Sequence, residues 1–180
     1  MQLLSKLLVV IGVLIITIAS YTYWQRNNPN RLKFNAAAEY VVVEKNTQVQ
    51  DSDPIGLVIQ DLGIRLPIIE ANYFEDRWET TSEGVSYLNS TVQPGEIGNS
   101  VLYGHNWGSI LKNLPKAKPG QTIQIIYADG STKDFEITYT QEVTPNDTSI
   151  LKNTKDTRIT LYTCSGFLDS KRFVVTALLK

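Results

Sequence analysis

Short runs of β-forming residues recur along the chain after Pro54, and they constrain the fold more than any other feature of the sequence. The runs are rich in Val, Ile, Thr, Tyr or Phe, and Gly, Pro, Asn or Asp separate them, which is typical of strands joined by turns. The expected strands span residues 55–59, 65–70, 85–88, 100–105, 122–127, 133–143, 158–163 and 172–179. Eight such strands suit a barrel or a sandwich, so we expect a mainly β domain.

The turns and helices of this domain are expected to be short. Asp129-Gly130 supplies the positive φ that a tight hairpin requires, and it lies between two alternating runs. Helices of one or two turns are expected over 74–80, 109–114 and 148–153. The prediction is therefore a β-barrel or sandwich with small helical insertions.

An uncharged and mostly apolar run extends from Leu7 to Trp24 near the amino terminus. As a helix, these residues rise about 27 Å, close to the roughly 30 Å hydrocarbon core of a bilayer. Tyr21, Tyr23 and Trp24 crowd the far end, where aromatic rings favour the headgroup level. A cleaved signal peptide is the alternative, but its apolar core usually has only about 7–15 residues. We expect an uncleaved transmembrane anchor over residues 1–25.

Residues 26–53 begin and end polar and are interpreted as a stalk, followed by a domain over residues 54–180.

The chain has 17 basic and 18 acidic side chains, with a formal net charge of −1. Because phosphate binding needs a basic surplus, nucleic acid is excluded as a partner. One Cys and one His form neither an intramolecular disulfide nor a Cys/His zinc site. We assign no metal and no cofactor.

The single Cys and the single His each stand at the end of an expected strand beside glycine. Cys164 lies off the most apolar face of its strand and precedes Ser165-Gly166, while His105 follows Gly104. Taken alone, a free Cys is usually a small buried apolar residue, and a lone His is usually structural. Together, at strand ends that can present side chains to a substrate, they suggest a thiol–imidazole couple.

Arg172 opens the last expected strand, on its less apolar face. A solvated charge at the strand start is the simplest interpretation of this residue. If residues 165–171 close a hairpin, however, Arg172 returns beside Cys164 and its planar fork can hold an oxyanion. The sequence thus allows Cys, His and Arg to converge.

These segments together resemble the sortase family, the cysteine transpeptidases of bacterial cell surfaces. Residues 160–164 (TLYTC) are similar to the family's TLxTC signature, residues 172–175 (RFVV) to its arginine strand, and residues 104–105 to its GH element. Residues 56–68 resemble the opening pair of strands, and residues 94–101 the segment before the family histidine. Five fragments in the family's order make the resemblance specific over nearly all of the expected domain.

The resemblance implies an eight-stranded β-barrel behind an amino-terminal membrane anchor. It implies Cys164 as nucleophile, His105 as acid/base, and Arg172 as the oxyanion-holding or substrate-orienting group. Further candidates for contact with substrate or oxyanion are Thr163, Ser165 and Asn106. Only seven residues separate Cys164 from Arg172, fewer than in most members, which leaves the sorting-motif preference open.

The resemblance also implies the partners and the location. The substrates would be secreted proteins with an LPxTG-like signal near the carboxyl end, and an amine of the cell envelope or of a pilin subunit would accept the acyl group. The catalytic domain would lie outside the cell membrane on a single-pass anchor. Two alternatives stay open: a hydrolytic cysteine protease, and a non-catalytic surface-binding or assembly module in which Cys164 is merely packed.

Overall fold

The computed structural model describes residues 2–26, 28–34, 53–74 and 77–180. The chain divides into two compact units, Met1–Arg31 and Leu32–Lys180, and we describe each by itself. Most of the predicted stalk lies outside the described residues. The division into anchor, stalk and domain at residues 25 and 53 stays a prediction.

The first unit contains one long helix, α1 (Gln2–Arg26), and all but the last residue of a 3₁₀ turn, η1 (Pro29–Leu32). Within α1, Leu4–Gln25 is apolar enough to cross a membrane, with a mean hydropathy of 2.2, and none of that stretch is buried. Its 22 residues rise about 33 Å, enough for the hydrocarbon core. The expected apolar helix is confirmed, and its length and composition fit a membrane span.

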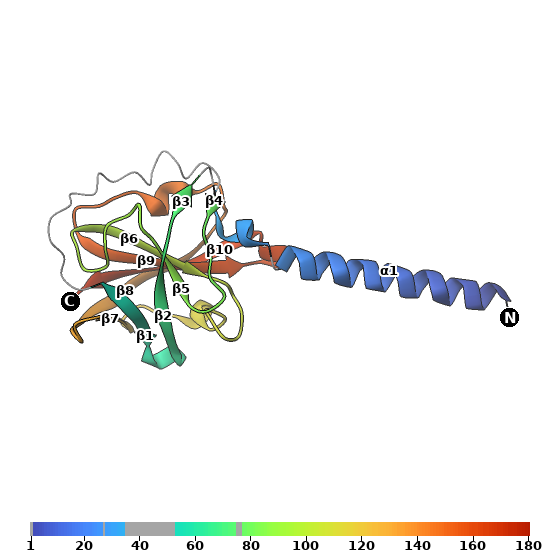
Figure 1. Ribbon diagram of the computed structural model, residues 1–180, viewed down its shortest axis with the longest axis horizontal. Helices are drawn as coiled ribbons and strands as arrows, with labels where there is room; N and C mark the ends of the chain where they lie inside the picture. The colour runs from blue at the N-terminus through green and yellow to red at the C-terminus, as the bar shows by residue number, and fades with distance from the viewer. Residues whose placement is uncertain (1, 27, 35–52, 75–76) are drawn as a thin grey trace. The chain divides into compact units, whose positions relative to one another are not determined.

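The second unit is built on a closed β-barrel of eight strands (Figure 1). The strands are β1 (Pro54–Ile59), β2 (Ile64–Ala71), β5 (Val85–Leu88), β6 (Gly98–Gly104), β7 (Thr122–Tyr127), β8 (Thr132–Val143), β9 (Thr157–Ser165) and β10 (Lys171–Leu179). Their order around the barrel is β1-β2-β5-β6-β9-β10-β8-β7. All eight expected strands are confirmed. The sheet closes on itself, so the domain is a barrel and not a sandwich. In a closed sheet no strand edge is left unpaired.

The strand directions place two parallel pairs in an otherwise antiparallel barrel. β2 pairs with β5 in parallel, and β6 pairs with β9 in parallel. The β7–β8 hairpin turns at Gly130, whose φ is 85°, as the Asp-Gly pair predicts. The parallel β6–β9 pair is the feature that positions the candidate site.

The remaining elements correct part of the helix prediction. They are the strands β3 (Tyr73–Phe74) and β4 (Arg77–Trp78) and the 3₁₀ turns η3 (Gln60–Leu62), η4 (Leu114–Lys116), η5 (Thr148–Leu151) and η6 (Phe167–Asp169). The helix expected over 74–80 is wrong, because β3 and β4 pair there and Trp78 is buried. Residues 109–113 form turns and not the expected helix, whereas the short helical turn expected from Thr148 is confirmed.

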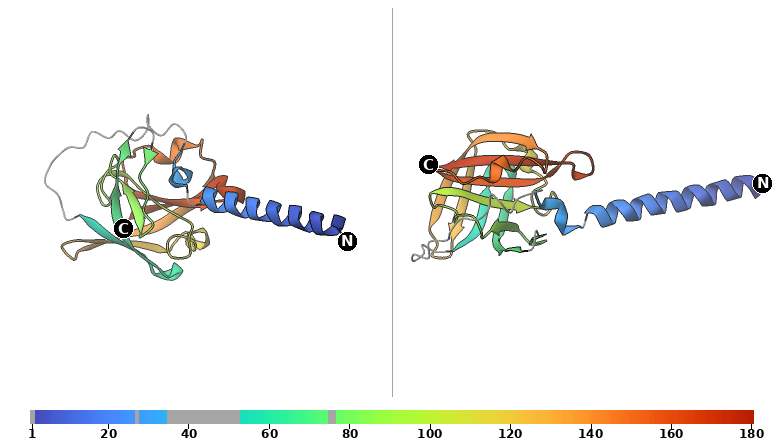
Figure 2. Two further views of the ribbon diagram at one scale, coloured as in Figure 1. Left: turned by 45° about the vertical axis from the view of Figure 1, so that its right-hand side comes forward. Right: turned by 90° about the horizontal axis from the view of Figure 1, so that it is seen from above.

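Apolar side chains gather in two clusters, one inside the barrel and one on its outer surface, because successive side chains of a strand point to opposite faces. On β9, Ile159 and Leu161 face the interior, while Tyr162 and Cys164 face outward. The outer cluster consists of Leu32, Phe34, Ala71, Trp78, Leu88, Val101, Tyr103, Val143, Leu151, Tyr162, Cys164 and Val174. Figure 2 shows the strands of the barrel from two further directions. The prediction that Cys164 lies off the most apolar face of its strand is confirmed.

Candidate active site

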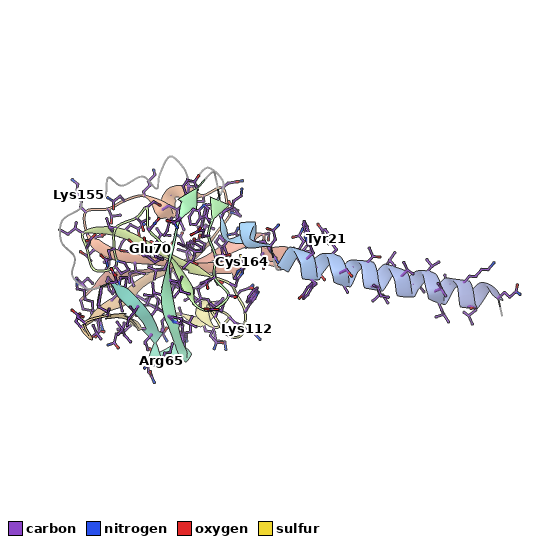
Figure 3. The ribbon with its side chains drawn as sticks, in the orientation of Figure 1. Tyr21, Arg65, Glu70, Lys112, Lys155 and Cys164 are labelled. Atoms are coloured by element: carbon purple, nitrogen blue, oxygen red, sulfur yellow. The ribbon has the colours of Figure 1, made fainter. Side chains whose placement is uncertain are left out.

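The parallel pairing of β6 and β9 brings His105 and Cys164 to the same end of the barrel. Gly104 on β6 is the register partner of Thr163 on β9, so His105 and Cys164 each follow that pair by one residue. Neighbouring strands lie about 4.8 Å apart. Figure 3 labels Cys164 at the opposite end of β9 from Lys155, which precedes the strand.

The β9–β10 hairpin adds Arg172 to the same place. Arg172 is the cross-strand partner of Cys164, and Lys171 is the partner of Ser165. Both side chains of the Cys164–Arg172 pair therefore project from the outer face of the barrel. The hairpin expected over 165–171 is confirmed, and it places the nucleophile candidate directly beside a guanidinium.

Arg172 is a buried charge, with only 3% of its surface exposed. Its Nη1 donates to the carbonyl oxygens of Asp169 and Lys171 at 3.0 and 2.9 Å, and its Nη2 donates to that of Lys33 at 3.1 Å. The guanidinium also lies over the ring of Phe34, 5.9 Å from its centroid. The interpretation of Arg172 as a solvated strand-start charge is wrong, because the hairpin folds it under a cover of backbone carbonyls.

His105 is held by stacking and by the turn that follows it. Its imidazole lies parallel to the indole of Trp107, with ring centroids 4.2 Å apart and 8° between the planes. Its carbonyl oxygen accepts from the backbone N–H of Leu111 at 3.0 Å, which closes the loop after β6. His105 is 7% exposed, and the stack with Trp107 restricts the orientation of its ring.

The three further candidates occupy different settings. The side chain of Thr163 is fully buried, and its hydroxyl donates to the carbonyl of Gly104 at 2.8 Å. It therefore ties β9 to β6, and its side chain is not accessible to a substrate. Asn106 donates to a carboxylate oxygen of Asp169 at 3.3 Å and so joins the histidine loop to the β9–β10 loop. Ser165 ends β9 half-buried.

The β9–β10 loop is short and conformationally unusual. Leu168 and Asp169 have φ of 51° and 58°, and Gly166 has φ of 75°. A Cβ on Gly166 would meet Ser170 Oγ at 2.9 Å, so glycine is required there. Non-glycine residues with positive φ cost energy and cluster at functional sites. The loop presents Phe167 to solvent with 85% of its surface exposed.

A layer of aromatic side chains lies on the outer face beside Cys164. Tyr103 and Tyr162 are register partners and stack with ring centroids 5.6 Å apart, and Trp78 packs edge-on to Tyr103 at 5.2 Å. Burial raises the pKa of Tyr162 well above its usual range, and Tyr103 adds to the rise while the Arg172 guanidinium opposes it. Burial likewise raises the pKa of Tyr103. Both phenols are therefore neutral at physiological pH.

The sequence interpretation missed the residues that cover this layer, Leu32 to Phe34, which it placed in the stalk. Leu32 and Phe34 are buried, and Tyr162 donates its hydroxyl to the carbonyl of Leu32 at 2.9 Å. A weak signal was present, because apolar residues alternate with basic ones in Arg31-Leu32-Lys33-Phe34. Among the described residues, no group of three or more His, Cys, Asp or Glu side chains is placed to hold a metal ion.

Comparison with known protein families identifies the family to which the barrel domain belongs. A family model described as "Sortase domain" matches residues 57–180, which is more than half of the chain. The chain belongs to the sortase family. The resemblance of its strand and strand-end segments to sortases is thereby confirmed.

Individual sortases resemble the chain at modest identity. "Sortase A" of Bacillus anthracis is 26% identical over 138 residues, covering 72% of this chain and 61% of that protein. This chain therefore spans about three fifths of that relative's length. "Sortase A from Corynebacterium diphtheriae, lid mutant" superposes with a TM-score of 0.61 at 25% identity, covering 75% of this chain and 74% of that one. Sortase C-1 from Actinomyces oris has the same TM-score and identity and covers 91% and 98%.

Proposed function

We propose that this sortase-family protein is a membrane-anchored cysteine transpeptidase with Cys164 as its nucleophile. The observation that carries the proposal is the register pair of Cys164 and Arg172, with His105 at the adjoining end of β6. Acyl transfer through a thiol needs a nucleophile, a proton donor and a group that holds negative charge. These three residues can supply those functions.

The first half-reaction forms a thioester. The Cys164 thiolate attacks the carbonyl carbon of the scissile peptide bond, and a tetrahedral intermediate with a negative oxygen results. Protonated His105 then donates its proton to the leaving nitrogen, the C–N bond breaks, and the amine departs. The acyl group remains on Cys164 as a thioester.

Arg172 is suited to hold or orient the substrate's carbonyl oxygen. Its fork already donates to backbone carbonyls, which have the same chemistry as the carbonyls of a peptide substrate. A backbone N–H near the end of β9 would be a second donor to the oxyanion. Loss of one such directed donor typically lowers kcat by 10²–10³.

In the second half-reaction an amine attacks the thioester carbonyl, and neutral His105 accepts the proton that the amine loses. The new amide bond forms as the C–S bond breaks, and Cys164 leaves as the thiolate. The proposed substrates are secreted proteins with an LPxTG-like signal, and the proposed acceptor is an amine of the cell envelope or of a pilin subunit. A hydrolytic cysteine protease would differ only in accepting water. A non-catalytic surface-binding module would leave Cys164 unacylated.

Mass spectrometry of the full chain in detergent tests these possibilities. The protein is incubated with a library of LPxTG-like peptides, with and without a small amine, beside Cys164→Ala as the matched control. A mass increase on Cys164 that the alanine variant lacks supports the nucleophile assignment, and its absence across the library supports the binding module. The ratio of ligated to hydrolysed peptide separates transpeptidase from protease.

The proposed location is the cell membrane, with α1 as a single span and the barrel outside. Its support is the apolar stretch Leu4–Gln25 and the proposed secreted substrates. Protease shaving of intact cells should digest the barrel. Digestion only after lysis would show that the topology is inverted.

A further inference from the structure

Trp107 packs its indole flat against the ring of the proposed proton donor, His105. The two planes are 8° from parallel, and the ring centroids lie 4.2 Å apart. The indole is half-buried and also packs against the apolar cluster inside the barrel, while His105 is 7% exposed. The stack is therefore largely shielded from water.

The backbone around the stack is fixed by one turn. The carbonyl oxygen of Trp107 accepts from the N–H groups of Ile110 and Lys112 at 2.9 and 3.1 Å, and that of His105 accepts from Leu111 at 3.0 Å. Ile110 and Leu111 are buried in the cluster inside the barrel. Because both rings belong to this hydrogen-bonded turn, their movement relative to each other is limited.

The indole face discriminates between the two protonation states of the imidazole. An aromatic ring carries negative charge density on its faces, so a cation within about 6 Å of the ring centroid is attracted, and Trp attracts it most strongly. A neutral imidazole has the packing and stacking energy of the contact but not this attraction. Shielding from water strengthens the electrostatic part. The contact therefore favours the imidazolium over the neutral ring.

Charges of both signs lie on the elements around His105. Cys164 ends β9 and is negative as a thiolate, and Asp169 in the following loop is hydrogen-bonded to the residue after His105. Arg172 on β10 and Lys112 in the turn are cations and oppose a positive imidazole. The tyrosines of the outer aromatic layer stay neutral. Because the contributions of the charges partly cancel, the neutral indole can set the balance.

We propose that Trp107 is a positioning residue that stabilises the protonated form of His105, and with it the thiolate–imidazolium pair that His105 forms with Cys164. The inference rests on the proposed function for the role of His105 as proton donor, but not for the preference for the cation itself. With an ordinary thiol and imidazole, only a minority of molecules carry both charges near neutral pH. A contact of this type raises the ratio of charged to neutral imidazole about 2- to 30-fold.

NMR titration of the imidazole in the full chain in detergent tests this preference without any substrate. His105 is the only histidine, so every imidazole signal reports this ring. Trp107→Leu keeps an apolar side chain but removes the aromatic face, and the midpoint of the titration should move to lower pH by about 0.4–1.5 units. Trp107→Phe keeps a weaker aromatic face and should shift the midpoint less. Trp24→Leu is the matched control, because the same change at an exposed indole of the first compact unit should leave the midpoint unchanged.

A second measurement keeps the test decisive if thermal unfolding shows that Trp107→Leu does not fold. Biosynthetic replacement of tryptophan by fluorotryptophans weakens the negative ring face and changes the shape of the side chain little. The midpoint should then fall with each added fluorine, whereas the same replacement in Trp107→Phe should leave it unchanged. A wild-type midpoint in folded Trp107→Leu, or a midpoint that does not respond to fluorination, would overturn the proposal.

Turnover of sorting peptides separates this inference from the proposed function. In Trp107→Leu the alkaline limb of the kcat/KM profile should move to lower pH together with the NMR midpoint, because the indole acts on the proton that His105 donates. If the midpoint moves as expected but no protein turns over any peptide, the role of Trp107 stands and the transpeptidase proposal fails. If peptides are turned over but the midpoint of the folded leucine variant equals that of wild type, the role of Trp107 is overturned while the enzyme stands.

Discussion

Arg172 carries a charge in a buried position, and backbone carbonyls accept hydrogen bonds from its Nη1 and Nη2 atoms. A lone ionised group in an apolar setting is costly, so such a group is found with hydrogen-bond partners. Here the partners are the carbonyls of Asp169, Lys171 and Lys33. The same contacts that stabilise the hairpin pre-orient the fork beside Cys164, which couples stability to the proposed chemistry at this residue.

Arg172→Lys should impair both the proposed reaction and the fold. Lysine keeps the charge but lacks the planar fork, so we expect kcat/KM to fall by roughly 10²–10³. The free energy of unfolding should fall by about 1–3 kcal/mol, because hydrogen bonds from a buried guanidinium to backbone carbonyls are lost. Steady-state kinetics and denaturant unfolding measure the two effects.

Lys171→Ala serves as the control for this prediction. Lys171 is half-exposed and pairs with Glu142 at 3.0 Å, so its loss should cost no more than about 1 kcal/mol and leave kcat/KM unchanged. Wild-type kinetics in Arg172→Lys would remove Arg172 from the reaction. A change confined to stability would make it a purely structural residue.

His105 is expected to act in its protonated form, which makes the proposed reaction depend on pH in both directions. The rate needs a thiolate and an imidazolium together, so kcat/KM should rise and then fall as pH increases. His105→Ala should remove nearly all activity. A wild-type profile that still rises above pH 9 would contradict the requirement for an imidazolium.

At the scale of elements, the β6–β9 pair holds the two halves of the thiol–imidazole couple in register. The strands run parallel from Gly98↔Thr157 to Gly104↔Thr163. At the last of these pairs, the Thr163 hydroxyl donates a hydrogen bond to the carbonyl of Gly104. Gly104 itself has little room, since a Cβ there would meet Ile110 and Leu111 at 3.1 Å. Small changes at the junction formed by Gly104 and Thr163 should therefore displace His105 relative to Cys164.

Thr163→Val tests the junction with a side chain of nearly the same shape. The substitution removes the buried hydrogen bond to Gly104, so we expect a loss of about 1–2 kcal/mol in unfolding free energy. We also expect a fall in kcat with KM nearly unchanged, because the residue positions the couple and does not contact substrate. Kinetics and chemical denaturation provide both numbers.

Thr138→Val is the matched control at an exposed site. Thr138 makes the same type of bond, to the carbonyl of Thr176 at 3.2 Å, but in contact with solvent. Its loss should cost less than about 0.5 kcal/mol. A raised KM in Thr163→Val with an unchanged kcat would instead support direct contact between Thr163 and substrate.

At the scale of the molecule, the second compact unit begins at Leu32 and so includes part of the predicted stalk. Full burial of a Leu or Phe side chain stabilises by about 1.5–3 kcal/mol, and ordering the backbone costs about 1–2 kcal/mol per residue. The net gain from Leu32 and Phe34 is therefore modest.

A chain that begins at Leu32 should be soluble and folded, and a chain that begins at Pro54 should be less stable by about 1–3 kcal/mol. The reason is that the shorter chain loses two buried side chains and the carbonyls that bind Tyr162 and Arg172. Calorimetry of the two proteins measures the difference. Identical melting temperatures would show that the segment contributes nothing to the fold.

The sequence by itself determined the features that depend on local pattern. Runs of β-forming residues separated by turn residues located all eight barrel strands, and Asp129-Gly130 located a hairpin. The alternation of side chains along β9 placed Cys164 off the most apolar face of its strand. The uninterrupted apolar run predicted the long helix. The same alternation puts Thr163 on the face of the strand that carries Leu161, and both side chains are fully buried.

Only the tertiary structure decided the features that depend on contacts between distant residues. Tyr162 reaches Leu32 across 130 positions and Arg172 reaches Lys33 across 139, and no local pattern encodes such pairs. The same reason explains the β3–β4 pair, where burial of Trp78 against Tyr103 overrides helix propensity. Burial of Arg172 likewise follows from a hairpin and a cover that are separated in the chain. The free energy of these contacts comes from surfaces that meet only once the barrel has closed.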